Sequence, residues 1–178
     1  SSDVCSSDLC GLGVALRQAR THLPARRVPL LGLSAAFVFA AQMLNFPVAG
    51  GTSGHLIGGV LTAVLLGPGA AVIVISTGLI VQCFLFADGG ITALGANVFN
   101  MALVGGVGGW TVYRAVSMFS KNLRSRLLAA ALAAWISTML ASVACAGELA
   151  ASGTVDWSVG WPAMVSVHAL IEIGRAHV

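Results

Sequence analysis

Apolar segments separated by short polar stretches run along the whole chain, and each apolar segment is predicted to form a helix. In chain order they cover 11–19, 30–46, 55–66, 70–87, 96–112, 127–146 and 161–171. The longer ones approach the roughly 20 residues that a helix needs to cross a bilayer. The predicted fold class is therefore an all-α polytopic membrane protein with six to seven transmembrane helices, of which the first and the last are truncated.

The third apolar segment, from His55 to Leu66, is too short for this role by itself. At a rise of 1.5 Å per residue it measures about 18 Å, whereas the hydrocarbon layer is about 30 Å thick. The Gly-rich stretch 50–54 in front of it must therefore dip into the membrane. Irregular backbone at that depth is tolerated only where protein or a watery cavity covers it.

Composition supports the membrane assignment, since 57% of the residues are hydrophobic and only 8% are charged. A soluble domain carries about 25% charged residues. The 22 glycines fit closely packed transmembrane helices, and a glycine-rich face at 105–109 is expected to pack in this way. The small net charge of +3 does not indicate a nucleic-acid partner, and the four cysteines show no disulfide or metal spacing.

The two ends of the chain differ from the rest. Residues 1–9 (SSDVCSSDL) are polar, and residues 172–178 (EIGRAHV) place charges into an apolar helix. Both strings are expected to be non-native sequence attached to a fragment, and such segments are excluded from fold reasoning. Residues 10–171 are predicted to form a single transmembrane domain.

The positive charges indicate an orientation. Outside 172–178 all of them fall at 17–27 or 114–126, namely at Arg17, Arg20, Arg26, Arg27, Arg114, Lys121, Arg124 and Arg126. Short loops rich in Lys and Arg stay on the cytoplasmic side. A multi-pass protein of the bacterial cytoplasmic (inner) membrane is therefore expected, with His55 facing outside.

Two polar patches on that outer side carry the candidate chemistry. The first contains Thr52, Ser53 and His55, and the second contains Asp88, Asn97 and Asn100. Neutral imidazole is a good ligand for Ni, Cu, Co and Zn. One histidine is too few for a metal site, so a metal-binding interpretation needs ligands from elsewhere.

Structural roles stay open for each of these residues. His55 serves equally as a helix cap, Asp88 as a helix-end cap in water, and the two asparagines as interhelical hydrogen-bond partners. His168 in the last apolar segment either pairs with another helix or belongs to the same pocket.

A different class of function is offered by the GTSG stretch at 51–54, which matches the GxSG pattern of rhomboid-type intramembrane serine proteases. There the serine leads a short helix and a histidine on a later helix is its base. Ser53 and His168 are the candidates for these roles. The sequence contains no HExxH, Walker lysine or GxGxxG motif, so the chain is not expected to hydrolyse ATP itself.

An ordered run of motifs is more specific than this four-residue pattern. It consists of NFPVAGGTSGHLIGG at 45–59, LGP at 66–68, DGGITALGANVFNM at 88–101 and HALI at 168–171. These motifs resemble the CbiM/NikM family, the substrate-capture subunits of energy-coupling factor (ECF) transporters for cobalt and nickel. The resemblance covers essentially all of 11–171.

The resemblance implies a seven-helix S-component-like bundle that is not an enzyme and imports Co(II) or Ni(II) as its substrate. The family binds the ion through the N-terminal amine, the histidine at position two with its backbone amide, and a loop histidine that His55 matches. The other ligands are thus expected from a Met-His start that this chain lacks. Four nitrogens in a near-square plane suit Ni(II).

The same resemblance implies partners. Family members work with a transmembrane coupling subunit, two cytoplasmic ATPase subunits and often a small accessory membrane subunit. The imported metal serves cobalamin biosynthesis or nickel enzymes. His55 suits cobalt and nickel alike, so the expected substrate is Co(II) or Ni(II), and no separate cofactor is expected.

Overall fold

The computed structural model describes residues 13–14, 17, 24–48, 53–55, 57–119 and 122–175. Its elements are η1 (Ala25–Arg27), α2 (Val28–Gln42), β1 (Asn45–Pro47), β2 (Ser53–His55), α3 (Gly59–Leu66), α4 (Pro68–Leu85), α5 (Gly90–Asn97), η3 (Val98–Gly108), α6 (Gly109–Ser117), α7 (Leu123–Ala151) and α8 (Trp157–Arg175). The predicted all-α class is confirmed, with one short hairpin added.

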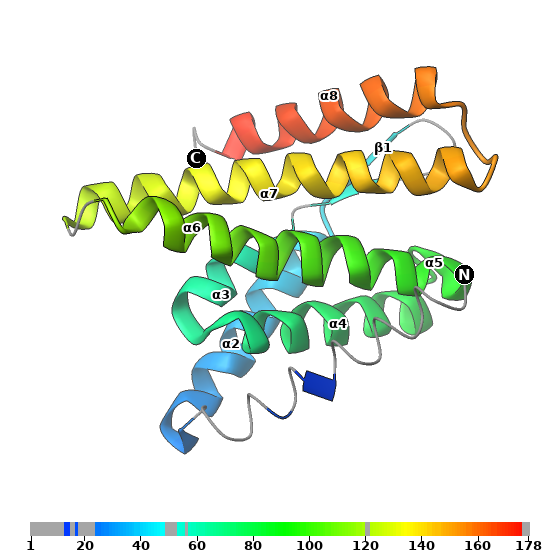
Figure 1. Ribbon diagram of the computed structural model, residues 1–178. Coiled ribbons are helices and arrows are strands. Elements are labelled where there is room, and N and C mark those ends of the chain that lie inside the picture. The colour runs from blue at the N-terminus through cyan, green and yellow to red at the C-terminus, as the bar shows by residue number, and fades with distance from the viewer. Residues whose placement is uncertain are drawn as a thin grey trace.

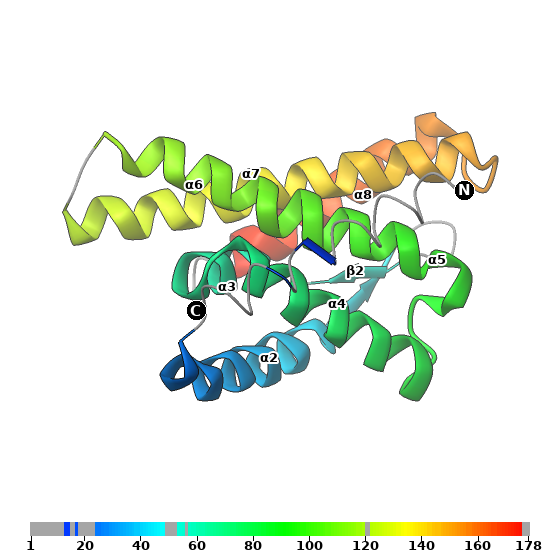
Figure 2. The same cartoon turned by 60° about the horizontal axis from the view of Figure 1, so that its bottom comes forward.

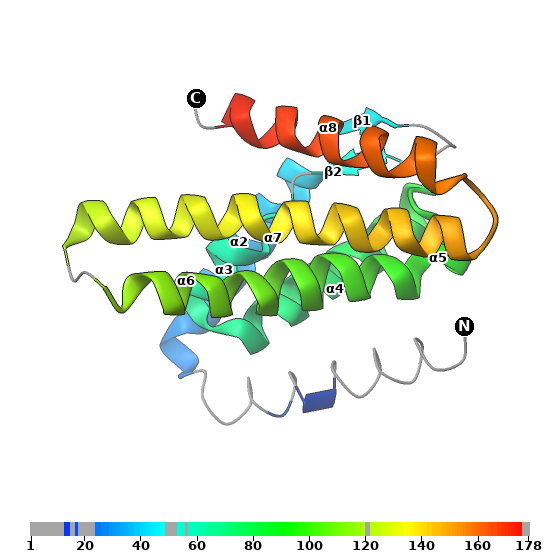
Figure 3. The ribbon, with the colours of Figure 1, turned by 45° about the horizontal axis from the view of Figure 1, so that its top comes forward.

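The longest helices form the frame of the bundle. α5, η3 and α6 follow one another without a break from Gly90 to Ser117, and this rod and α8 both lie along α7 (Figures 1 and 3). α3 and α4 pack on the other side of the rod, and α2 packs against α4 and α3 (Figure 2). In the described part of the chain, three segments are long and apolar enough to span a membrane: Pro68–Leu85, Gly90–Ser117 and Leu123–Ala151.

The distribution of side-chain sizes fits a lipid-facing exterior. Large apolar side chains lie on the outside, with Leu33 68% and Leu128 71% exposed, whereas Ala71 and Ala102 are fully buried. Small residues inside let neighbouring helices approach closely, which is how transmembrane helices gain packing energy. The bundle interior is therefore held by close contact rather than by large apolar side chains alone.

Glycines at the start of α3, in η3 and at the start of α6 make close contacts of this kind. A Cβ added to Gly59 at the start of α3 would lie 2.9 Å from the Cα atom of Gly106, and one on Gly105 would lie 2.8 Å from Ile57 Cγ2. Gly109 faces Val60 and Ser137 in the same way, whereas Gly108 has only an ordinary contact. The expected packing role of this glycine face is confirmed, and it brings α3 against η3.

The segment around His55 differs from the expectation. The pattern predicts a helix from His55, but α3 begins only at Gly59, and His55 ends strand β2 instead. β2 pairs antiparallel with β1, with His55 opposite Asn45 and Gly54 opposite Phe46. Pairing satisfies the backbone hydrogen bonds of this non-helical segment, which a membrane protein cannot leave open to lipid. α3, with eight residues, is even shorter than predicted.

The boundaries of the last two helices also differ from the predicted ones. α7 continues to Ala151, so Glu148 belongs to a helix and not to the polar loop predicted at 147–160. α8 begins at Trp157 and runs through Arg175. The division of the chain into 1–9, 10–171 and 172–178 stays a prediction.

Five arginines and two aspartates of the described part lie at opposite ends of the bundle. η1, the end of α6 and the start of α7 lie at one end, and they carry Arg26, Arg27, Arg114, Arg124 and Arg126 (Figure 1). The start of α5 and the turn between α7 and α8 lie at the other end, close to Asp88 and Asp156. The fold thus separates the charges in the way that the sequence pattern requires.

Candidate functional site

The segment that carries His55 is fixed on its C-terminal side by a left-handed residue. Gly58 has φ 66°, and a Cβ added there would lie 3.0 Å from Val38 Cγ2 on α2. Only glycine adopts this conformation without strain. The turn at Gly58 converts the path of β2 into that of α3, and it sets where His55 stands relative to the bundle.

A buried pair of glutamines holds the same segment. Gln42 Nε2 donates to the Ile57 carbonyl at 3.0 Å, and Gln82 Nε2 donates to Gln42 Oε1 at 3.2 Å. Both side chains are almost fully buried. Polar groups in such surroundings are costly unless they are hydrogen-bonded. The pair therefore ties α2 and α4 to the residue two positions after His55.

The same relay reaches the second polar patch. The Asp88 amide donates to the Gln82 carbonyl at 3.2 Å, which closes the end of α4. Asp88 lines a small pocket of about 10 Å³ together with Gln82 and Asn97. Gln82 thus contacts Gln42 through its side chain and Asp88 through its backbone carbonyl.

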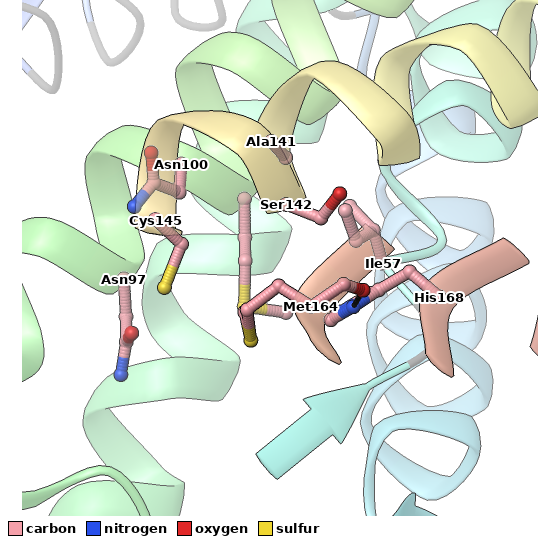
Figure 4. A pocket seen from close by; sticks show the side chains of 9 residues that line it. Ile57, Asn97, Asn100, Ala141, Ser142, Cys145, Met164 and His168 are labelled. Carbon is pink, nitrogen blue, oxygen red and sulfur yellow. Dashed lines mark hydrogen bonds between the residues drawn. The ribbon is translucent and has the colours of Figure 1, made fainter. Parts of the chain in front are cut away.

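A larger cavity of about 50 Å³ lies beside the hairpin segment. It is lined by Ile57, Asn97, Asn100, Met101, Ala141, Ser142, Cys145, Met164 and His168 (Figure 4). These residues come from the segment after β2 and from α5, η3, α7 and α8. The cavity is therefore a meeting point of the longest helices with the segment that carries His55.

Asn100 is the most polar part of the cavity wall. Its Nδ2 donates to Glu148 Oε2 at 2.7 Å, and the residue is only 4% exposed. Within the described residues its Oδ1 atom is buried and has no hydrogen-bond partner. The carboxylate of α7 is thereby held next to the cavity, where it provides negative charge.

His168 has a defined orientation in the same wall. Its Nδ1 lies 2.8 Å from the Met164 carbonyl, one turn earlier on α8. Since a carbonyl only accepts, Nδ1 carries the proton and the ring lone pair is on Nε2. His168 Cε1 lies 3.5 Å from the place that a Cβ on Gly54 would take. The imidazole thus packs against β2 next to His55.

The predicted site residues are brought together only in part. Asn97, Asn100 and His168 line the cavity, whereas Asp88 lines the neighbouring pocket, with Asn97 shared by both. His55 and Ser53 lie on β2 beside the cavity wall, and their side chains fall outside what the structure describes. Thr52 also lies outside the described residues.

The structure does not meet the requirement of the serine protease interpretation. That interpretation needs a serine at the start of a short helix, but Ser53 opens a β-strand. α3 starts six positions later, at Gly59. No feature of the described residues favours a nucleophilic serine here.

Several residues of the site were not predicted as such. They are Gln42, Gln82, Cys145, Glu148 and Met164. The two glutamines had a usable signal, because a polar side chain inside an apolar helix is rare and has a partner or a function. Cys145 and Met164 had none, since both residue types are common in apolar cores.

Known proteins resemble this chain closely. The profile of the CbiM family, described as cobalt uptake substrate-specific transmembrane region, matches residues 6–178. A relative in Archaeoglobus fulgidus, named as a fused nickel transport protein, NikMN, is 46% identical over 146 residues, which make 81% of this chain and 48% of that protein. The cobalt transport protein CbiM of Acetoanaerobium sticklandii is 37% identical over 83% of this chain and 60% of that protein.

The fold agrees with these matches. A crystal structure of a transition metal transporter superposes with a TM-score of 0.86 at 32% identity, covering 94% of this chain and 78% of that one. This chain spans about half the length of the fused relative. A profile match over nearly the whole chain, together with a fold shared at this identity, leaves one assignment: the chain belongs to the CbiM family.

Proposed function

We propose that the chain is the substrate-capture subunit of an ECF-type transporter that imports Co(II) or Ni(II), with His55 as a ligand of the captured ion. One observation carries the proposal. The segment with His55 is held by the Gln42–Gln82 pair against a cavity wall that contains Asn97, Asn100 and His168. The names of the two relatives, a nickel and a cobalt transport protein, support the choice of ion.

The chemistry of the ligand favours these ions. Imidazole nitrogen binds first-row transition metals, whereas Mg and Ca prefer oxygen. The remaining nitrogen ligands are expected from a Met-His start, as the family resemblance implies. A metal bound in this way is the cargo of the protein and not a resident cofactor.

The surrounding polar residues have supporting roles in this proposal. Asn100 holds the Glu148 carboxylate beside the cavity at 2.7 Å, and that negative charge favours a cation nearby. Asp88 and Asn97 border the neighbouring pocket. Thr52 and Ser53 precede His55 and are proposed to shape the approach of the ion to it.

The proposed transport function also implies partner subunits and an orientation in the membrane. A transmembrane coupling subunit and two cytoplasmic ATPase subunits, in some systems with a small accessory membrane subunit, supply the energy, and this chain does not catalyse hydrolysis. The basic end of the bundle faces the cytoplasm of a bacterial cell, and the segment with His55 faces outside across the inner membrane. The gathering of Arg114, Arg124 and Arg126 at one end supports this orientation.

The test measures ion capture by the His55→Ala variant. The protein carrying a Met-His start is titrated with Co(II) and Ni(II) in detergent, and uptake of the radioactive ions is followed in cells that contain the partner subunits. Loss of the ligand is expected to weaken binding roughly tenfold or more, because even the loss of a residue that only hydrogen-bonds to a metal ligand costs that much. Uptake is expected to fall with binding.

Two controls decide between interpretations. Ser53→Ala is expected to bind and transport as the parent does, whereas a serine protease would lose cleavage of a membrane substrate. The chain without the Met-His start is expected to bind weakly. Equal, tight binding by the chain with and without that start, or by His55→Ala, would refute the proposed ligand set.

A further inference from the structure

Sulfur-containing side chains from three different elements line the 50 Å³ cavity. Met101 comes from η3, Cys145 from α7 and Met164 from α8, and the His168 imidazole joins them from the next turn of α8. Figure 4 shows the Met164 side chain lying between Cys145 and His168 across the cavity. Residues far apart in the sequence thus place two thioethers, one thiol and one imidazole around one space.

These four side chains offer donor atoms that prefer soft metal ions. Thioether and thiolate ligands select soft ions such as Cu(I), and imidazole binds copper as well. Hard ions such as Mg and Ca take about six oxygen ligands. Among the described lining residues, side-chain oxygens come only from Asn97, Asn100 and Ser142. A cavity needs a volume of only about 10–15 Å³ to hold one water molecule. The cavity of about 50 Å³ therefore has room for a dehydrated ion.

The kind of donor atom decides between a monovalent and a divalent ion. Met101 and Met164 bring uncharged thioethers and Cys145 a thiol, and sulfur donors of this kind select soft monovalent ions such as Cu(I). The described lining residues include no Lys or Arg that would repel a cation. When the ion binds, the thiol proton passes to the buffer, and the sulfur–hydrogen bond is replaced by a sulfur–metal bond.

Two further features fix the nitrogen and oxygen donors of this wall. The Nδ1 atom of His168 lies 2.8 Å from the Met164 carbonyl, which holds the imidazole in one orientation. The Oδ1 atom of Asn100 is buried in the same wall and, within the described part of the chain, has no partner. A buried oxygen of this kind indicates an unfilled interaction.

We propose that this cavity binds one thiophilic monovalent ion, of the Ag(I) and Cu(I) class, through the sulfurs of Met101, Cys145 and Met164 together with the His168 imidazole. The site is distinct from the capture of Co(II) or Ni(II) at His55. It makes the protein a binder of soft ions in its interior, whatever ion the segment with His55 captures.

The experiment uses Ag(I) alone, which shares the chemistry of Cu(I) and is not oxidised in air. The full chain with Cys5→Ser and Cys10→Ser is titrated calorimetrically in detergent and chloride-free buffer. One ion per chain is expected, and X-ray absorption at the silver edge should report sulfur neighbours. Met101→Leu/Met164→Leu keeps the side-chain size, and it is expected to weaken binding about tenfold or more, as is Cys145→Ser.

Matched controls test whether the cavity is responsible. Met118 is 78% exposed at the end of α6, and Cys83 is buried in α4 outside this cavity. Met118→Leu, Cys83→Ser and His55→Ala are each expected to bind Ag(I) as the parent does. Unchanged binding by the double methionine variant would overturn the proposal. Loss of binding in His55→Ala would do so as well, since it would assign the ion to the capture segment.

Discussion

Gly58 is the residue on which the position of His55 depends most directly. Its φ of 66° is left-handed, and the space for a Cβ is filled by Val38. We expect Gly58→Ala to destabilise the protein by about 1–3 kcal/mol through backbone strain and crowding. Thermal unfolding in detergent measures the loss, and Co(II) or Ni(II) binding should weaken with it because the segment shifts.

A glycine in open surroundings provides the comparison. Gly32 lies in α2, and a Cβ added there would meet nothing within 4 Å. Gly32→Ala is expected to be neutral or slightly stabilising, since alanine favours a helix over glycine by roughly 1 kcal/mol. Similar behaviour of the two variants would show that the left-handed turn at Gly58 does not matter for stability.

At the residue scale, the sequence predicted which residues line the site better than how they are arranged. Asn97, Asn100 and His168 were recognisable because polar groups in apolar segments are costly and have partners or functions. Their meeting around one cavity depends on how α5, η3 and α8 cross, which is a tertiary property. The roles of Cys145 and Met164 appear only once those crossings are known.

At the scale of elements, the Gln42–Gln82 pair joins α2, α4 and the segment after β2. Gln42→Leu would leave the Ile57 carbonyl and Gln82 without the Gln42 hydrogen bonds, so we expect a loss of about 1–3 kcal/mol for each buried group left unpaired. Ion binding is expected to weaken, since the position of β2 is no longer fixed from behind. Unfolding and titration are measured on the same samples.

A double-mutant cycle measures the coupling energy between Gln42 and Gln82. Gln82→Leu removes the donor to Gln42 Oε1, and Gln42→Leu/Gln82→Leu replaces both partners with apolar side chains. The double variant is expected to lose clearly less stability than the sum of the two single ones, because residues in contact are not additive. Strict additivity would mean that the two glutamines act independently.

Element boundaries were predictable where local signals are strong. α4 starts at Pro68 after Gly67 and ends at Leu85, within two residues of the predicted 70–87, since proline suits the first turn of a helix. The hairpin of β1 and β2 had no comparable signal, because three-residue strands leave no alternating pattern. η3 is π-helical, and its Gly106 lies against Gly59 of α3, a tertiary contact that no local pattern reports.

At the scale of the whole molecule, charge separation and fold agree. Sequence alone predicted which loops share a side, since Lys and Arg bias acts on short loops without reference to packing. The bundle then places the α6–α7 end opposite the α7–α8 turn (Figures 1 and 3). The number of long spans was less predictable, because α3 covers only Gly59–Leu66 although the apolar segment begins at His55.

This arrangement predicts the sidedness of two exposed positions. Met118 follows α6 at the basic end, and Ser152 follows α7 at the opposite end. In a background with the native cysteines replaced by serine, Ser152→Cys is expected to react with a membrane-impermeant maleimide added to intact spheroplasts. Met118→Cys is expected to react only after permeabilisation, because short segments rich in Lys and Arg, here with Arg114 and Arg124, favour the cytoplasmic side.

Complete labelling of both variants in detergent serves as the control for thiol reactivity. If Met118→Cys reacts from outside and Ser152→Cys does not, the bundle is inserted the other way round. The segment with His55 would then face the cytoplasm, and capture of an external ion by it would be impossible. Because orientation follows from the charges and capture from His55, the labelling result tests the direction of transport separately from the identity of the ligand.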